Sequence, residues 1–346
     1  MRVTAPDTAF AGALAGDVQD VPPIWLMRQA GRYQKAYQAF RQQHTFEQLC
    51  RTPHLSAKVA LAAVDDFDFD AAILFSDLLF PLDALGFGLS YDDGGPRLAR
   101  SLTPEMLGTL PSTESALADL SFQADALRET RQALPADKGL IGFVGGPWTL
   151  FVYALEGRHT GTLTRSKSSF ALYQQFAQVI VPLIAAQIRV QLDAGADVVM
   201  VFDTAAGELA PSDFRRELSG DLTKLAEAAA GRVGYYARAL HPAHLDDGAT
   251  MSGPWAGLGV DWRWNLPELM RSPGRRGFVQ GNFDPALLHL TGRPLECALD
   301  AFLDPFVAMP PAERRGWICG LGHGVLPGTP EASVRTFVKT VRRRLA

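Results

Sequence analysis

Eight short apolar segments alternate with helical stretches along the whole chain, and this alternation constrains the fold more than any other feature. The segments span residues 23–27, 70–75, 139–144, 197–202, 233–237, 257–261, 277–282 and 317–322. Strands that alternate with helices form parallel sheets. Eight units over about 320 residues, with no linker between them, predict a single-domain (β/α)8 TIM barrel. A doubly wound sheet is the alternative. We expect the barrel to occupy residues 21–346, after an N-terminal arm of residues 1–20.

Turn and loop signals place several other elements. Thr52-Pro53 predicts a helix start, because a threonine N-cap precedes proline at the first helical position. Gly94-Gly95-Pro96 predicts a hairpin or excursion within residues 86–100. The segment 158–169 is rich in small polar and cationic residues, which is typical of a mobile loop. His241 and His244 flank a proline, and this spacing favours a surface turn over a metal site.

The first apolar segment ends in two arginines, Arg28 and Arg32, with Gly31 between them. Like charges four residues apart repel each other, so the pair predicts an anion that lies between them. A guanidinium holds a carboxylate by two parallel hydrogen bonds, which makes the pair suitable for a di- or polycarboxylate. The alternative is that both are surface residues paired with nearby Asp or Glu side chains.

Polar residues follow most of the other apolar segments. In a barrel, the carboxyl ends of the strands form the active site, so we expect these side chains to converge. They are Asp77, Pro147-Trp148, Asp203, Thr204, Asp261, Asn282 and His323. Each has a structural alternative. An aspartate can cap the next helix, and a histidine is more often a hydrogen-bonded structural group than a catalyst.

Composition and missing motifs exclude several classes of protein. The 346 residues carry a net charge of -4 and no basic stripe, which argues against nucleic acid, and no run approaches the ~18 apolar residues of a membrane span. The three scattered cysteines form neither a disulfide framework nor a zinc motif, and no metal is expected. Dinucleotide, P-loop and nucleophile-elbow signatures are absent. Since no signal peptide precedes Pro22, we expect a cytoplasmic enzyme.

Six distinctive blocks follow one another from about residue 22 to the C-terminus. They are Met27-Arg28-Gln29-Ala30-Gly31-Arg32-Tyr33, Ile73-Leu74-Phe75-Ser76-Asp77-Leu78-Leu79, Gly145-Gly146-Pro147-Trp148-Thr149-Leu150 with Tyr153, Phe202-Asp203-Thr204-Ala205-Ala206-Gly207, Gln280-Gly281-Asn282-Phe283-Asp284-Pro285 and Leu321-Gly322-His323-Gly324-Val325-Leu326-Pro327. In register, these blocks resemble the uroporphyrinogen decarboxylase family. The chain departs from the family at Phe283, where leucine is usual, and within residues 241–255, which lack the expected acidic helical character.

The resemblance implies a homodimeric TIM barrel that converts uroporphyrinogen III to coproporphyrinogen III in haem biosynthesis. Four acetates each lose carbon dioxide and become methyl groups, and no cofactor is expected. Substrate-binding positions implied by the family are Arg28, Gln29, Ala30, Gly31, Arg32, Arg41, Asp77, Tyr153, Thr204 and His323.

The implied chemistry assigns roles to two of these residues. Protonation of the pyrrole carbon beside the acetate makes a cationic ring that accepts the electrons left by carbon dioxide, so the substrate is its own electron sink. Asp77 is expected to stabilise that cation, and nearby arginines are expected to keep it ionised. Candidate proton donors are Arg28, Tyr153, His323 and water, and we assign the role to Arg28.

Two alternatives remain from other classes. A zinc-dependent methyltransferase that acts with a corrinoid protein shares this barrel, but carries a His-x-Cys motif and a distant cysteine that this chain lacks. A non-catalytic tetrapyrrole-binding protein could also retain the fold.

Overall fold

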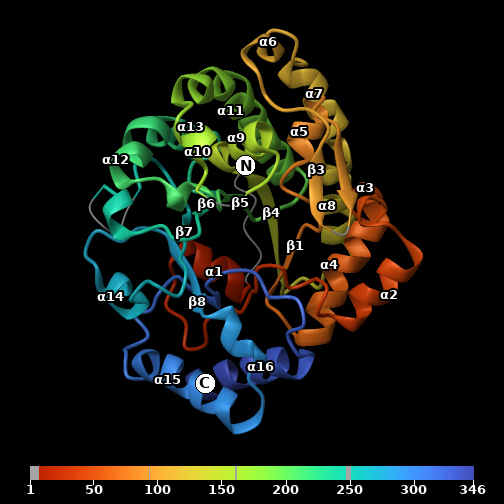
Figure 1. Ribbon diagram of the computed structural model, residues 1–346. Helices are drawn as coiled ribbons and strands as arrows, with labels where there is room; N and C mark the ends of the chain where they lie inside the picture. Colours follow the sequence, from red (N-terminus) through yellow and green to blue (C-terminus); the bar gives the residue numbers. More distant parts are fainter. Residues whose placement is uncertain (1–7, 93, 160–161, 247–250) are drawn as a thin grey trace.

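The strands of the computed structural model form one curled parallel sheet surrounded by helices (Figure 1). The structure describes residues 8–92, 94–159, 162–246 and 251–346. Seven strands follow one another in the order β1-β4-β5-β6-β7-β8-β9. They are β1 (Ala71–Ile73), β4 (Gly139–Gly145), β5 (Val198–Phe202), β6 (Val233–Tyr236), β7 (Gly257–Gly259), β8 (Phe278–Phe283) and β9 (Trp317–Leu321). Each coincides with a predicted segment.

The first predicted strand is reduced to a single bridge that closes the sheet. Ile24 pairs in parallel with Cys319 of β9, and the Trp25 amide donates to the Cys319 carbonyl at 3.2 Å. On the other side, the Asp70 amide donates to the Ile24 carbonyl at 2.9 Å, directly before β1. Residues 23–25 therefore take the first strand position of the barrel and close the sheet between β9 and β1. The predicted TIM barrel is confirmed.

Helices cover the outside of the sheet. They are α2 (Lys35–Gln43), α3 (Phe46–Arg51), α4 (Pro53–Phe67), α5 (Phe80–Ala84), α6 (Pro104–Leu107), α7 (Thr113–Asp119), α8 (Ser121–Ala133), α9 (Pro147–Glu156), α10 (Thr164–Lys167), α11 (Phe170–Asp193), α12 (Pro211–Asp213), α13 (Ser219–Glu227), α14 (Leu266–Arg271), α15 (Gly292–Val307) and α16 (Glu331–Leu345). Helix α4 starts after Thr52 with Pro53 at its first position, as predicted. Helix α15 has an apolar face that the sequence analysis did not identify, with Leu295, Leu299 and Leu303 buried.

Helix α11 is long and apolar enough to cross a membrane by length and composition alone. It packs against β4, β5, α9 and α13, and it runs through Pro182 without a break. The Tyr173 hydroxyl is buried and donates to Asp221 of α13 at 3.1 Å. These contacts identify α11 as a core helix of the barrel.

Two predicted irregular segments take partly regular forms. Strands β2 (Leu89–Asp92) and β3 (Gly95–Leu98) form the expected antiparallel hairpin. The predicted loop 158–169 contains the short helix α10, while residues 160–161 of that loop lie outside the described residues. Pro242–His244 form the predicted turn. However, His244 is buried, and its ring nitrogens form hydrogen-bond contacts with the carbonyls of His241 and Leu209.

The described part of the predicted N-terminal arm is a helix packed on the amino end of the barrel. Helix α1 (Ala9–Ala15) starts at Thr8, whose hydroxyl accepts from the Ala11 amide at 2.9 Å. Phe10 is fully buried and occupies the space beside Gly139, the first residue of β4. This helix therefore covers one mouth of the barrel and leaves the other for the site.

We expect Phe10→Ala to lower the free energy of unfolding by about 3 kcal/mol, because it removes a buried ring and leaves a cavity. Turnover should remain near that of the unmodified protein, since α1 lies at the opposite end from the strand-end residues. Urea unfolding followed by circular dichroism measures the first effect. An unchanged midpoint would show that α1 does not belong to the cooperative fold.

Candidate active site

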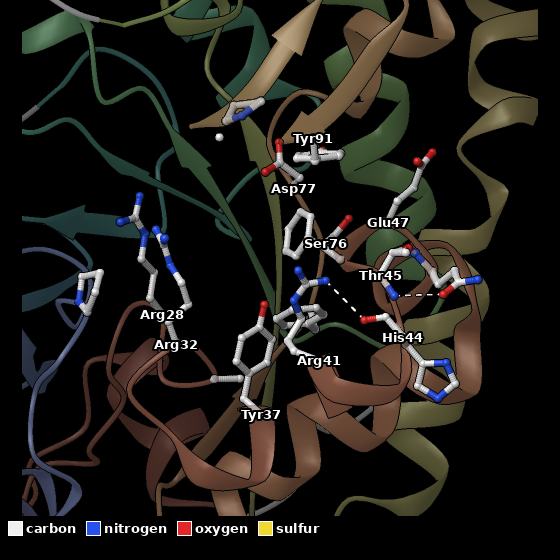
Figure 2. A pocket seen from close by; sticks show the side chains of 18 of the residues that line it. Arg28, Arg32, Tyr37, Arg41, His44, Thr45, Glu47, Ser76, Asp77 and Tyr91 are labelled. Atoms are coloured by element: carbon white, nitrogen blue, oxygen red, sulfur yellow. Dashed lines mark hydrogen bonds between the residues drawn. The ribbon is translucent and has the colours of Figure 1, made fainter. Parts of the chain in front are cut away.

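Two adjoining cavities lie at the carboxyl ends of the strands. The larger has a volume of about 970 Å³ and opens toward α2, α3 and the β2–β3 hairpin. The smaller has a volume of about 340 Å³ and extends over the strands β4 and β5. Both are lined by Arg28, Ala30, Ser76 and Asp77, so these residues form the boundary between them. Figure 2 shows Asp77 and the arginines projecting into the same space.

The loop that carries Arg28 is tied firmly to the barrel. Gln29 is fully buried, and its side-chain amide donates to the Ala71 carbonyl of β1 at 2.9 Å. The Tyr33 hydroxyl donates to the Gln29 carbonyl at 2.6 Å. Arg28 itself has a φ of 60°, in the left-handed region that non-glycine residues rarely adopt. Gln29 therefore anchors the loop to β1 and lines the smaller cavity, while Arg28 lines both cavities.

Gly324 provides the space that the Arg28 side chain occupies. A β-carbon at this position would lie 2.4 Å from Cδ of Arg28 and 2.7 Å from its Cγ. The glycine after His323 is therefore required by the packing of Arg28 rather than by a turn.

Arg32 and Arg41 line the larger cavity with Arg28. Arg41 donates to the His44 carbonyl at 3.3 Å, as the dashed line in Figure 2 shows. Among the ion pairs of the described residues, none includes Arg28, Arg32 or Arg41. Arg28 and Arg32 are exposed, as the alternative predicts, but in the part of the chain that the structure describes neither is paired with a carboxylate. Three guanidinium groups are available to an anionic ligand.

Asp77 is half-buried and lines both cavities. The Leu79 amide donates to its Oδ1 at 2.8 Å, and the Arg28 charge and the Tyr91 hydroxyl also favour its ionised form. Burial nevertheless raises the pKa of Asp77 above its ordinary value. The Arg28 charge favours the ionised form of Asp77, as expected, but desolvation has the larger effect on its pKa.

Tyr91 of the β2–β3 hairpin lies beside Asp77 (Figure 2). Its ring packs edge-on against Phe46, with centroids 4.8 Å apart, and its hydroxyl is buried. Burial, together with the Asp77 charge, raises the pKa of Tyr91 far above its ordinary value. The hydroxyl therefore keeps its proton and can only support the carboxylate as a dipole.

In Tyr91→Phe, we expect the acid limb of the profile of kcat/KM against pH to move up by about one pH unit. The Tyr91 hydroxyl makes no hydrogen bond among the described residues, but its dipole favours the charged form of Asp77. Its loss should therefore raise the pKa of that carboxyl, and one pH unit corresponds to about 1.4 kcal/mol. Initial rates between pH 4 and 9 measure the shift. Ser90→Ala, an exposed change on the same strand, should leave the limb in place. A lower rate with an unmoved limb would contradict this role for Tyr91.

Tyr153, Thr204 and His323 line the smaller cavity, as the sequence analysis predicts. Tyr153 projects from α9, and burial together with the Asp77 charge raises its pKa. Tyr236 donates its hydroxyl proton to the Gly322 carbonyl at 2.8 Å and contacts Nδ1 of His323 at 2.9 Å. Since a hydroxyl has one proton, both contacts are satisfied when Nδ1 of His323 donates and Nε2 is left as an acceptor.

His323 is neutral at physiological pH. Burial, followed by the Arg28 and Arg238 charges, lowers its pKa to about 3. A neutral imidazole with this tautomer accepts a hydrogen bond at Nε2. It has no proton to donate there, so His323 is a poor candidate for the acid.

Several predicted strand-end residues are structural. Asp203 is fully buried, and its Oδ1 accepts from the amide and the hydroxyl of Thr149, both at 2.7 Å, which joins β5 to the start of α9. Burial raises the pKa of Asp203 to about 6. Asp261 accepts from the amides of Ala239 and Arg263, and the Asn282 side chain donates to the Asp261 carbonyl at 2.9 Å.

Residues that the sequence analysis missed complete the cavity walls. Tyr37 and Tyr91 line the larger cavity, and His159 and Arg238 line the smaller one. Arg238 immediately follows a predicted strand, so its position could have identified it. Tyr91 lies on a hairpin, and no strand-end rule applies to it.

The described ranges contain no group of three His, Cys, Asp or Glu side chains placed to hold a metal ion. Cys50 and Cys319 are buried, and burial raises the pKa of each thiol well above its ordinary value.

Comparisons with known proteins agree with the geometry. The family model described as "Uroporphyrinogen decarboxylase (URO-D)" matches residues 5–344. The chain is 36% identical to a protein named uroporphyrinogen decarboxylase from Anaeromyxobacter sp. (strain Fw109-5), over 92% of this chain and 93% of the relative. A protein of the same name from Solibacter usitatus is 32% identical over 99% of both chains. Among solved structures, a methyltransferase from Methanosarcina mazei superposes with a TM-score of 0.77 at 19% identity, over 98% of both chains, which reflects a shared fold.

Proposed function

The chain belongs to the uroporphyrinogen decarboxylase family and is a carboxy-lyase, and we propose that Asp77 and Arg28 carry its reaction in the two adjoining cavities. The single observation that supports this assignment most is the setting of Asp77. A half-buried carboxylate faces a cavity whose wall carries three arginines with no ion-pair partner among the described residues. Such a wall suits a ligand with many carboxylates around a ring that becomes cationic.

The substrate is uroporphyrinogen III and the product coproporphyrinogen III, in haem biosynthesis. In each of four rounds, a proton adds to the pyrrole ring carbon beside the one that bears the acetate and makes the ring cationic. The bond between the acetate methylene and its carboxylate then breaks, carbon dioxide leaves, and the electron pair enters the ring. A second proton adds to the exocyclic methylene to form the methyl group, and loss of the proton from the ring carbon restores the pyrrole. Each round consumes one proton in total.

Asp77 stabilises the cationic ring. Its Oδ1 is held by the Leu79 amide at 2.8 Å, which leaves Oδ2 free to accept from pyrrole N–H groups. Because the carboxylate is held in place and bound substrate displaces water from the cavity, its charge can act on the ring directly, and groups placed in this way typically contribute factors of about 10² to 10³ to the rate.

Arg28 donates the proton to the ring carbon. Among the other side-chain candidates, His323 is neutral with its free nitrogen as an acceptor, and Tyr153 lines only the smaller cavity, whereas Arg28 lines both. Arginine is a weak acid because its reference pKa is high. Its suitability as the donor comes from its position, since Arg28 and Asp77 line both cavities. Water that enters the larger cavity restores the proton.

The remaining predicted residues bind substrate. Arg32 and Arg41 hold carboxylates in the larger cavity, and Ala30 and Gly31 form the floor beneath them. Tyr153 and Thr204 donate to carboxylates in the smaller cavity, and Nε2 of His323 accepts from a pyrrole N–H.

The protein acts as a homodimer in the cytoplasm. Support comes from the family resemblance, whose members are homodimeric. Small-angle scattering of the purified protein should give twice the mass of 37.5 kDa. A mass equal to that of one chain would refute the dimer.

Anaerobic incubation of the metal-stripped protein with chemically reduced uroporphyrin III tests the function. Products are oxidised and separated by their number of carboxyl groups. We expect seven-, six-, five- and four-carboxyl porphyrins to appear in sequence without added cofactor. Binding without turnover would favour a tetrapyrrole-binding protein. Neither turnover nor binding would contradict uroporphyrinogen as the substrate.

A further inference from the structure

Arg238 stands on the side of the barrel opposite the arginine cluster. Around the barrel, the segment at Ile24 takes the first strand position, and β1, β4, β5, β6, β7, β8 and β9 follow it. Arg28 and Arg32 follow the first position, and Arg238 follows β6, which is the fifth of the eight. In a closed barrel of eight strands, the first and fifth positions face each other across the mouth.

The backbone that carries Arg238 is fixed on two sides. The next residue, Ala239, has a φ of 61°, and its amide donates to Oδ2 of the buried Asp261 at 2.7 Å. From the β5 side, Gly207 packs so closely that a β-carbon there would lie 2.0 Å from the Arg238 carbonyl. The guanidinium therefore extends from a rigid base, as a binding residue requires.

The side chain lines the smaller cavity together with Thr204, Tyr153 and His323. Asp77 is the one carboxylate among the described residues that line this cavity, and Arg238 forms no ion pair with any described residue. Its charge reaches the ring of His323, whose pKa it helps to lower. A cation on this wall is available to a ligand.

We propose that Arg238 binds a carboxylate side chain of the tetrapyrrole across the ring from Arg28, Arg32 and Arg41. This inference rests on the proposed function. Eight carboxylates are distributed around the rim of the substrate, so cations on one wall alone would leave the far arms without partners. Arg238 provides the partner on the far wall and fixes the orientation of the ring above Asp77.

Equilibrium binding of uroporphyrin III, followed by its fluorescence, tests the proposal with Arg238→Gln and Arg238→Lys. Charged hydrogen bonds of this kind typically correspond to a factor of about ten or more in affinity. We expect R238Q to weaken binding about tenfold and to raise KM for uroporphyrinogen III similarly. R238K should recover part of the loss, because it restores the charge without the planar fork. Arg128→Gln, an exposed change on α8, is the matched control.

Two results would overturn the proposal while leaving the decarboxylase activity intact. One is R238Q binding within twofold of the unmodified protein. The other is an equal loss in R238Q and R238K together with a lowered melting temperature, which would show that Arg238 supports the fold. If the unmodified protein bound uroporphyrin but released no carbon dioxide, the proposed function would fail instead.

Discussion

Asp77→Asn is expected to lower kcat by about a thousandfold while the protein still binds uroporphyrinogen. The substitution keeps the shape of the side chain and the oxygen that accepts from the Leu79 amide, but removes the negative charge. Removing one fixed group that stabilises a developing charge typically costs a factor of about 10² to 10³. The ring becomes cationic only during the reaction, so the loss should fall on kcat rather than on binding.

The same substitution should raise the stability of the fold at neutral pH. Burial raises the pKa of Asp77 in the folded state, so the folded protein binds the proton more tightly than the unfolded chain does. The stability that Asp77 contributes therefore falls as pH rises from below its unfolded pKa through its higher folded pKa. Above that window its buried charge opposes folding, and asparagine carries no such charge.

Single-turnover assays under anaerobic conditions, combined with thermal unfolding at pH 5 and pH 8, measure both effects. Asp137→Asn, an exposed change of the same chemistry, is the matched control and should alter neither quantity. Turnover of Asp77→Asn within tenfold of the unmodified protein would remove Asp77 from the mechanism. A lower melting temperature at pH 8 would contradict the direction of its pKa shift.

The barrel could be predicted from the sequence because each of its strands is a separate apolar segment bounded by turn residues. All seven strands of the parallel sheet coincide with segments predicted by their apolar character. The first predicted strand is the exception, because it forms a single bridge and not a regular strand. Its apolar run is as long as the others, yet only Ile24 pairs with β9. Pairing depends on the neighbouring backbones, and the apolar pattern of one segment does not contain that information.

The site could be predicted where residues follow strands, and not where other elements fold over them. The substrate-binding residues implied by the family, from Arg28 to His323, all line one or both cavities, whereas the predicted strand-end residues Asp203, Asp261 and Asn282 do not. Tyr91 was missed because it reaches Asp77 only through the hairpin, fourteen residues further along the chain. Asp203 and Asp261 follow strands as Asp77 does, but their oxygens are occupied by hydrogen bonds with the neighbouring loops. Which aspartate faces the cavity is decided by that packing.

Arg28→Gln is expected to lower kcat/KM by at least about a hundredfold. Arg28 lines both cavities, so its loss removes a carboxylate contact and the proposed proton donor together. Glutamine suits the test because it keeps a β-carbon at the left-handed φ of 60°, whereas glycine would also relieve backbone strain. Because the Arg28 charge lowers the pKa of Asp77, the acid limb of the pH profile should also move to higher pH.

Gly324→Ala tests the position of Arg28 while leaving its charge in place. The new methyl group would lie 2.4 Å from Cδ of Arg28 and would push the guanidinium away from its present site. We expect a loss of about tenfold in kcat/KM, since misplacement of a catalytic group by about 1 Å is costly. Gly220→Ala on α13, where a β-carbon meets nothing within 4 Å, should keep full activity. If Gly324→Ala were fully active and Arg28→Gln inactive, the charge of Arg28 would matter but its placement would not, and its role as a positioned proton donor would have to be abandoned.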